Sequence, residues 1–231
     1  MIDLTRIDEQ ALSTEPYSWA FVGELFSPSD AAALVESYPE DSFKTLIGND
    51  GEKGWEYEAR SLIHMGAAAA SHPENLSRAW QQLAEDLVSP GYREAMSRLT
   101  GQDLTASAIE VNVFHYGPGA WMGPHKDLAD KVVTHVLYFN EEDWDPKAGG
   151  CLTILRSSEM SDVEAEIPPV VGNSVVLVRS EQSWHAVSRV ADGSSTSRRS
   201  VTVTFYKSGA VSTMWPPGEE TPLHRYARAA A

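Results

Sequence analysis

Runs of apolar residues in the second half of the chain predict β-strands. Residues 132–139 are β-branched and aromatic almost throughout, which is typical of a strand buried on both faces. Similar short runs follow at residues 151–155, 173–178 and 200–206, and turns rich in glycine, proline or asparagine separate them. Short strands spaced in this way predict an antiparallel sandwich or jelly roll.

The first hundred residues show helical patterns instead. Ser27-Pro-Ser-Asp30 has the serine, first-turn proline and acid that begin a helix, and residues 31–37 continue it. Residues 75–88 place apolar side chains along one helical face, namely Leu76, Trp80, Leu83 and Leu87. Residues 91–99 predict a further helix. We expect these helices to support the larger sheet without taking part in chemistry.

A glycine-rich, charged stretch at residues 43–55 lies between the predicted helices. It suggests either a lid over the mouth of the barrel or an ordinary surface hairpin. The pattern of residues does not distinguish these two interpretations.

Candidate metal ligands follow a loop-like segment. Residues 116–124 contain three glycines and two prolines, which predicts a loop rather than a central strand. His125 and Asp127 come next, and at this spacing their side chains share a face if the chain is extended. The His-x-Asp tripeptide alone is weak because the chain has seven histidines. Together with His185, however, it forms a set that can hold ferrous iron on one face.

Five sequence pieces in order resemble one known family. Residues 109–207 resemble the double-stranded β-helix core of the iron(II)- and 2-oxoglutarate-dependent dioxygenases, and within them the prolyl 4-hydroxylase-like group. The matching pieces are Tyr116 with its Gly-Pro-Gly turn, His125-x-Asp127, residues 138–150, Trp184-His185-x-Val187 and Arg198-x-Ser200-Val-Thr202. The resemblance implies a mainly β fold with supporting α-helices around a jelly-roll, cupin-like core.

The resemblance also implies the ligands and cosubstrates of the site. His125, Asp127 and His185 would bind Fe(II), and dioxygen and 2-oxoglutarate would be the cosubstrates. A basic residue at the start of a late strand would pair with the far carboxylate of 2-oxoglutarate.

Arg198 fits the register of that basic residue because Ser200 and Thr202 alternate to the same face of a strand. A long loop before it leaves Arg199 as the alternative. Tyr138 and Tyr116 resemble the hydroxyl groups that contact the cosubstrate in the family.

The leading functional hypothesis is hydroxylation of an unactivated C–H bond in a small molecule, such as an amino acid, an amino-acid derivative or a natural-product intermediate. One alternative is hydroxylation of proline or another residue in a peptide or protein. The other is a non-catalytic or 2-oxoglutarate-independent cupin-like metalloprotein. Asp127 disfavours halogenation, because halide-transferring members replace this ligand with a small residue. Desaturation and ring closure remain open.

Four other residues near the motif have alternative roles that the sequence does not distinguish. Trp121 and Met122 either line the substrate pocket or fill the core. His115 and His135 lie in strand-like segments, and we interpret them as packing residues or as neighbours of the site.

Length, composition and charge limit the domain organisation and the partners that the chain can have. The 231 residues, 42% of them hydrophobic, predict one domain with helical support and flanking strands at about 1–105, a catalytic jelly roll at about 106–208 and a C-terminal extension at 209–231. The net charge of −15 disfavours nucleic acid as a partner. No apolar run suggests a membrane segment, and the single Cys151 precludes an internal disulfide. We therefore expect a cytoplasmic protein.

Overall fold

The structure, a computed structural model, describes residues 1–49, 54–218 and 221–226. The helices are α1 (Leu4–Asp8), α2 (Pro28–Glu36), α3 (Arg78–Val88) and α4 (Pro90–Thr100), with 3₁₀ turns η1 (Pro73–Asn75) and η2 (Pro146–Ala148). The strands are β1 (Trp19–Val22), β2 (Lys44–Asn49), β3 (Gly54–Ile63), β4 (Ala108–Tyr116), β5 (Trp121–His125), β6 (Lys131–Tyr138), β7 (Leu152–Leu155), β8 (Val163–Ile167), β9 (Ser174–Val178), β10 (His185–Val187) and β11 (Arg198–Tyr206).

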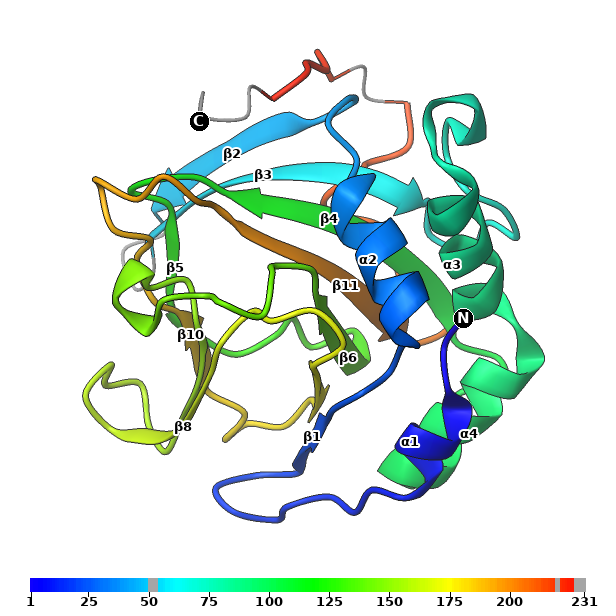
Figure 1. Ribbon diagram of the computed structural model, residues 1–231. Coiled ribbons are helices and arrows are strands. Elements are labelled where there is room, and N and C mark those ends of the chain that lie inside the picture. The colour runs from blue at the N-terminus through cyan, green and yellow to red at the C-terminus, as the bar shows by residue number, and fades with distance from the viewer. Residues whose placement is uncertain (50–53, 219–220, 227–231) are drawn as a thin grey trace.

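All these strands join one curled antiparallel sheet. Its order is β1-β9-β6-β11-β4-β3-β5-β10-β7-β8, and β2 pairs with β3 beside this path. The larger layer runs from β1 to β3, and β5, β10, β7 and β8 form a smaller layer facing it (Figure 1). The mainly β fold with supporting helices and a double-stranded β-helix core is therefore as predicted.

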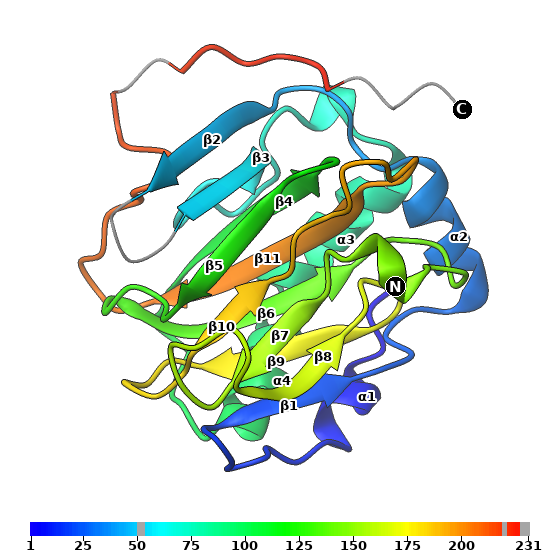
Figure 2. The same cartoon turned by 90° about the vertical axis from the view of Figure 1, so that its left-hand side faces the viewer.

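Two apolar clusters hold these layers together. One cluster lies between the larger layer and the helices, which cover the face turned away from the smaller layer (Figure 1). The other, here called the interior cluster, lies between the two layers and includes Tyr57, Phe114, Tyr116 and Tyr138. Figure 2 shows the smaller layer in front of the larger one. Side chains on the inward face of the larger layer can therefore share a site with side chains of the smaller layer.

Helices α2, α3 and α4 form where the sequence predicts them, with small shifts at their ends, whereas α1 has no counterpart in the sequence analysis. Ser27 caps α2, where its Oγ accepts a hydrogen bond of 3.2 Å from the backbone N–H of Asp30. The predicted helix at residues 75–88 begins only at Arg78, because Ser77 is its cap and the preceding residues form η1. Gly101 ends α4 in the left-handed conformation, with φ of 66°.

The predicted loop at residues 116–124 is wrong in its second half, because Trp121–His125 form β5. Pro124 is tolerated there because the register is irregular: Trp121 and Met122 pair with β3, His125 pairs with β10, and the intervening residues have no paired partner. His185 begins the short strand β10.

Residues 43–55 fall mostly in the antiparallel hairpin β2–β3, whose tip at residues 50–53 lies outside the described part of the chain. The lid interpretation involves that tip and stays a prediction. The strands of the hairpin extend the larger layer through the pairing of β3 with β4. Within the described residues, no helix has the length and apolar character needed to cross a bilayer.

Candidate functional site

Three potential metal ligands meet where the strands of the smaller layer begin and end. His125 ends β5 and His185 begins β10, and the two residues are register partners with ring centroids 4.2 Å apart. Asp127 follows two residues after His125. One ligand atom from each of the three side chains lies within 4.8 Å of the others, so the cluster could hold a metal ion.

Backbone carbonyls fix which nitrogen each imidazole presents. His125 Nδ1 lies 2.9 Å from the carbonyl oxygen of Gly123, and His185 Nδ1 lies 3.0 Å from that of Ser183. A carbonyl oxygen can only accept, so Nδ1 carries the proton in both rings and Nε2 bears the lone pair. This arrangement is typical of metal-binding histidines.

The Asp127 carboxylate is held by two donors from the neighbouring strand. Lys131 Nζ contacts Oδ1 and Thr134 Oγ1 donates to Oδ2, both at 2.7 Å. Burial alone would raise the pKa of Asp127, but the Lys131 ammonium and the two imidazoles outweigh it and hold the pKa well below its usual range. The carboxylate is therefore charged, as a metal ligand must be.

Sequence reasoning missed Lys131 and Thr134. A Lys four residues after an Asp suggests a helical pair, but here a turn between the two residues brings them together, and Lys131 N–H donates to Leu128 O at 3.1 Å. Only the fold reveals these contacts.

A buried guanidinium lies deeper between the layers. Arg198 is 2% exposed, donates from Nη1 to Ser200 Oγ at 2.8 Å, and lies 4.8 Å and 5.5 Å from the ring centroids of Tyr116 and Tyr138. Its Nε and the Tyr138 hydroxyl are buried without a hydrogen-bond partner, and no carboxylate of the described residues forms an ion pair with it. Burial raises the pKa of Tyr116 to about 12 and also raises that of Tyr138. A buried cation beside neutral donors suits a carboxylate ligand.

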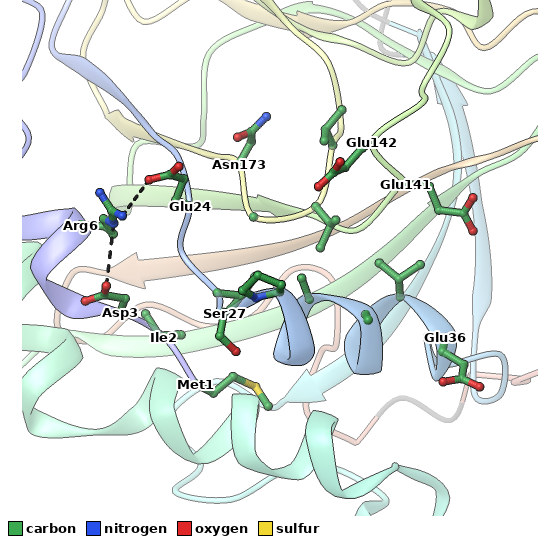
Figure 3. Close-up of a pocket in the computed structure, with 18 of the residues that line it drawn as sticks. Met1, Ile2, Asp3, Arg6, Glu24, Ser27, Glu36, Glu141, Glu142 and Asn173 are labelled. Carbon is green, nitrogen blue, oxygen red and sulfur yellow. Dashed lines mark ion pairs between the residues drawn. The ribbon is translucent and has the colours of Figure 1, made fainter.

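Arg199 points to the opposite face of β11. Its guanidinium lies 5.6 Å from the ring of Tyr38 on the helix side, and its backbone N–H donates to Asn140 Oδ1 at 2.8 Å. Arg199 also lines a cavity of about 1310 Å³. This cavity lies between α2 and the chain around residues 141–142 and 170–173, and Figure 3 shows Glu36, Glu141, Glu142 and Asn173 around it. None of the candidate metal ligands lines that cavity, so Arg198 is the arginine on the inward face.

Some of the other predicted site residues lie on the inward face of the sheet and others do not. Ser200 and Thr202 share the inward face with Arg198; Ser200 is buried, and Thr202 is half-buried opposite Asn112. Met122 packs against the interior cluster, whereas a side chain added at Gly54 would meet the Trp121 ring. The structure therefore brings Met122, but not Trp121, to the interior cluster.

His115 and His135 lie apart from the metal cluster. His135 Nδ1 contacts Tyr92 Oη at 2.8 Å under helix α4, and His115 Nδ1 lies 3.2 Å from Glu58 Oε2. His115 also stacks on Tyr226, with ring centroids 3.7 Å apart. Their contacts are those of packing residues.

Two histidines and an aspartate within 4.8 Å of one another, in a double-stranded β-helix that also buries an arginine, are typical of non-haem iron oxygenases. Residues 111–206 match the family model of the 2OG-Fe(II) oxygenase superfamily, and this span carries all the candidate site residues. This match makes residues 111–206 similar to that superfamily, which implies Fe(II), 2-oxoglutarate and dioxygen as cofactor and cosubstrates. The match favours an enzyme over the non-catalytic alternative.

Solved structures support the fold. A prolyl-4-hydroxylase of Pseudomonas putida is 23% identical, with 89% of this chain and 99% of that chain covered and a TM-score of 0.57. A prolyl hydroxylase of Trichoplax adhaerens, in complex with a hypoxia inducible factor oxygen degradation domain peptide fragment, is 14% identical, with coverages of 89% and 87% and a TM-score of 0.56. A prolyl 4-hydroxylase of Phytophthora capsici is 16% identical, with coverages of 90% and 66% and a TM-score of 0.59. No curated protein matches the chain.

Proposed function

We propose that His125, Asp127 and His185 bind Fe(II) and that Arg198 binds the far carboxylate of 2-oxoglutarate, so that the enzyme hydroxylates an unactivated C–H bond of a small molecule. The observation that carries the proposal is the pairing of a preformed His/Asp/His cluster with a buried arginine that has no carboxylate partner among the described residues.

The residues present fit the implied cofactors. Two imidazole Nε2 atoms and one charged carboxylate are the donor set that would hold ferrous iron and leave positions for cosubstrates. When bound, Fe(II) and 2-oxoglutarate supply the oxidative decarboxylation that activates dioxygen and oxidises the substrate.

Side chains and backbone carbonyls of the protein would position the metal ligands and the cosubstrate. Thr134 and Lys131 orient the Asp127 carboxylate, and the carbonyls behind both histidines fix the tautomer in which Nε2 would be the donor atom to a metal. Arg198 and the Tyr138 hydroxyl offer donors to a carboxylate in a site from which the interior cluster excludes water. These contacts would hold 2-oxoglutarate in one orientation.

The test is an anaerobic titration of metal-free protein with Fe(II) and then 2-oxoglutarate, which follows the visible charge-transfer band of the chelate. We expect a band in the unaltered protein, no band in His185→Ala, and a much larger 2-oxoglutarate requirement in Arg198→Ala than in the matched control Arg199→Ala. Metal binding without a band in the unaltered protein would refute the proposal.

A peptide or protein substrate is the second candidate. The solved structures of prolyl hydroxylases, one of them with a peptide fragment bound, favour it. The two candidates differ in a simple assay: free amino acids stimulate succinate release if the substrate is small, whereas only proline-containing peptides do so if the enzyme modifies a chain.

A further inference from the structure

Residues 212–215, here called the C-terminal strap, lie beyond the segment that matches the family model. Two polar residues on the inward face of β4 bind it, and both are buried: Glu110 is 2% exposed and Asn112 is 4% exposed. Ser212 Oγ donates a short hydrogen bond to Glu110 Oε1, and Trp215 Nε1 donates to Asn112 Oδ1 at 2.7 Å. The strap is therefore fixed to the sheet by specific contacts.

The carboxyl of Glu110 has no ion-pair partner among the described residues. It is satisfied instead by Ser212, by the Tyr206 hydroxyl at 3.2 Å and by the Asn112 amide at 3.3 Å. A buried carboxyl is costly unless its hydrogen bonds are made, so displacement of the strap would leave Glu110 short of a donor. This cost favours one position of the strap.

The strap is also held from the opposite side. Lys44 of β2 donates from Nζ to the carbonyl oxygen of Met214, and its ammonium lies 4.2 Å from the centroid of the Trp215 ring. Met214 and Trp215 pack, partly buried, against the interior cluster. The strap therefore lies between the hairpin β2–β3 and the inward face of β4, with an apolar and aromatic surface next to the interior.

The sheet register places the strap at the metal end of the barrel. Glu110 pairs with Thr204, and Thr204 pairs with Thr134, which donates to the Asp127 carboxylate. Two strand spacings separate Glu110 from Thr134, which is roughly 10 Å. Arg198 instead pairs with Tyr116, six residues further along β4 and roughly 20 Å away.

The two ends of the barrel therefore differ in what they can bind. With 2-oxoglutarate between the metal and Arg198, as the proposed function requires, the substrate must occupy the space beside the metal that the cosubstrate leaves. The strap lies across the sheet from the metal, because Ser212 binds at Glu110, level with Thr134, and Trp215 binds at Asn112, two residues further toward Arg198. It can therefore border that space.

We propose that the C-terminal strap is a wall of the substrate pocket, that Met214 and Trp215 contact the substrate, and that the wall selects an apolar or ring-bearing group next to the oxidised carbon. The inference rests on the proposed function and deepens it, because it assigns specificity to residues outside the shared catalytic core. Aromatic and methionine side chains supply a large contact surface for such a group.

The test uses the full chain loaded with Mn(II) and 2-oxoglutarate, and free proline, leucine, phenylalanine, glutamate and lysine as probes. Ligand-observed NMR measures the metal-dependent relaxation of each probe, which reports binding near the metal and needs no turnover. We expect proline, leucine or phenylalanine to relax more strongly than glutamate and lysine. Trp215→Ala should reduce that enhancement at least fivefold, while the Kd of 2-oxoglutarate stays within twofold.

Two further variants keep the outcome interpretable. Trp215→Phe retains an aromatic ring and should keep most of the probe binding even if Trp215→Ala folds poorly. Val211→Ala, at a position that is 59% exposed, should behave as the unaltered protein does. Equal relaxation of all probes, or enhancement unchanged in Trp215→Ala, would overturn the inference while leaving the proposed function intact. Failure of the unaltered protein to bind 2-oxoglutarate with metal would instead overturn the proposed function, and the inference with it.

Discussion

Replacing Arg198 by glutamine removes a buried charge that has no ion-pair partner among the described residues. Two charge-assisted hydrogen bonds to a carboxylate contribute about 1.5–3 kcal/mol each, and glutamine would restore one neutral bond of about 1 kcal/mol. The net loss of about 2–5 kcal/mol corresponds to a roughly 30-fold to 4,000-fold increase in the Kd of 2-oxoglutarate. Arg199→Gln, on the outer face of the same strand, should leave that Kd unchanged.

Thermal unfolding with Mn(II) checks this prediction without turnover. At a 2-oxoglutarate concentration 100 times the Kd of the unaltered protein, the ligand should stabilise that protein by about 2.7 kcal/mol. A variant with a 100-fold higher Kd should gain only about 0.4 kcal/mol under the same conditions. Without ligand, Arg198→Gln should be no less stable than the unaltered protein, because an unpaired buried charge is itself costly. Equal loss of ligand stabilisation in Arg198→Gln and Arg199→Gln would refute the reasoning.

Three further outcomes are expected. Thr134→Val, which removes the donor to Asp127 Oδ2, should weaken Mn(II) binding about 10-fold to 100-fold in calorimetric titration, and Thr204→Val on the adjacent strand should not. Tyr92→Phe leaves the buried His135 without its 2.8 Å partner and should cost about 1–3 kcal/mol in urea unfolding at pH 7. Burial lowers the pKa of His135 to about 3, below its unfolded value, so stability falls as pH drops below about 6.5; at pH 5 this group should cost about 2 kcal/mol, a loss that His135→Leu should not show in the same unfolding assay.

The sequence predicts those helices and strands whose hydrophobic pattern lies within the element itself. Buried strands such as β6 and β11 follow from apolar runs, and helix α3 follows from the spacing of Trp80, Leu83 and Leu87. Strand β5 escapes prediction because its glycine and proline residues argue against a strand, and only its pairing with β3 and β10 stabilises it. Tertiary pairing overrides local preference there.

The candidate site likewise contains residues that the sequence predicts and residues that it does not. His125, Asp127, His185 and Arg198 can be named from their spacing and from family resemblance. The donors to Asp127 and the anchors of the strap cannot, because 102 residues separate Glu110 from Ser212 and no local pattern links them. Contacts of this kind depend on which strands become neighbours, which a single sequence does not specify.

Both layers of the sheet supply residues to the candidate site, and the elements that could determine substrate specificity lie outside it. Two candidate metal ligands come from β5 and β10 in the smaller layer, whereas Arg198 and the donors to Asp127 come from β11 and β6 in the larger layer. In the proposed function, binding of metal and cosubstrate would therefore depend on contacts across both layers and would leave little freedom for change within the core. The strap at residues 212–215 and the β2–β3 hairpin contact this core from outside residues 111–206. Changes there can alter the substrate without altering the chemistry, so transfer of activity between related oxygenases should require exchange of both elements together.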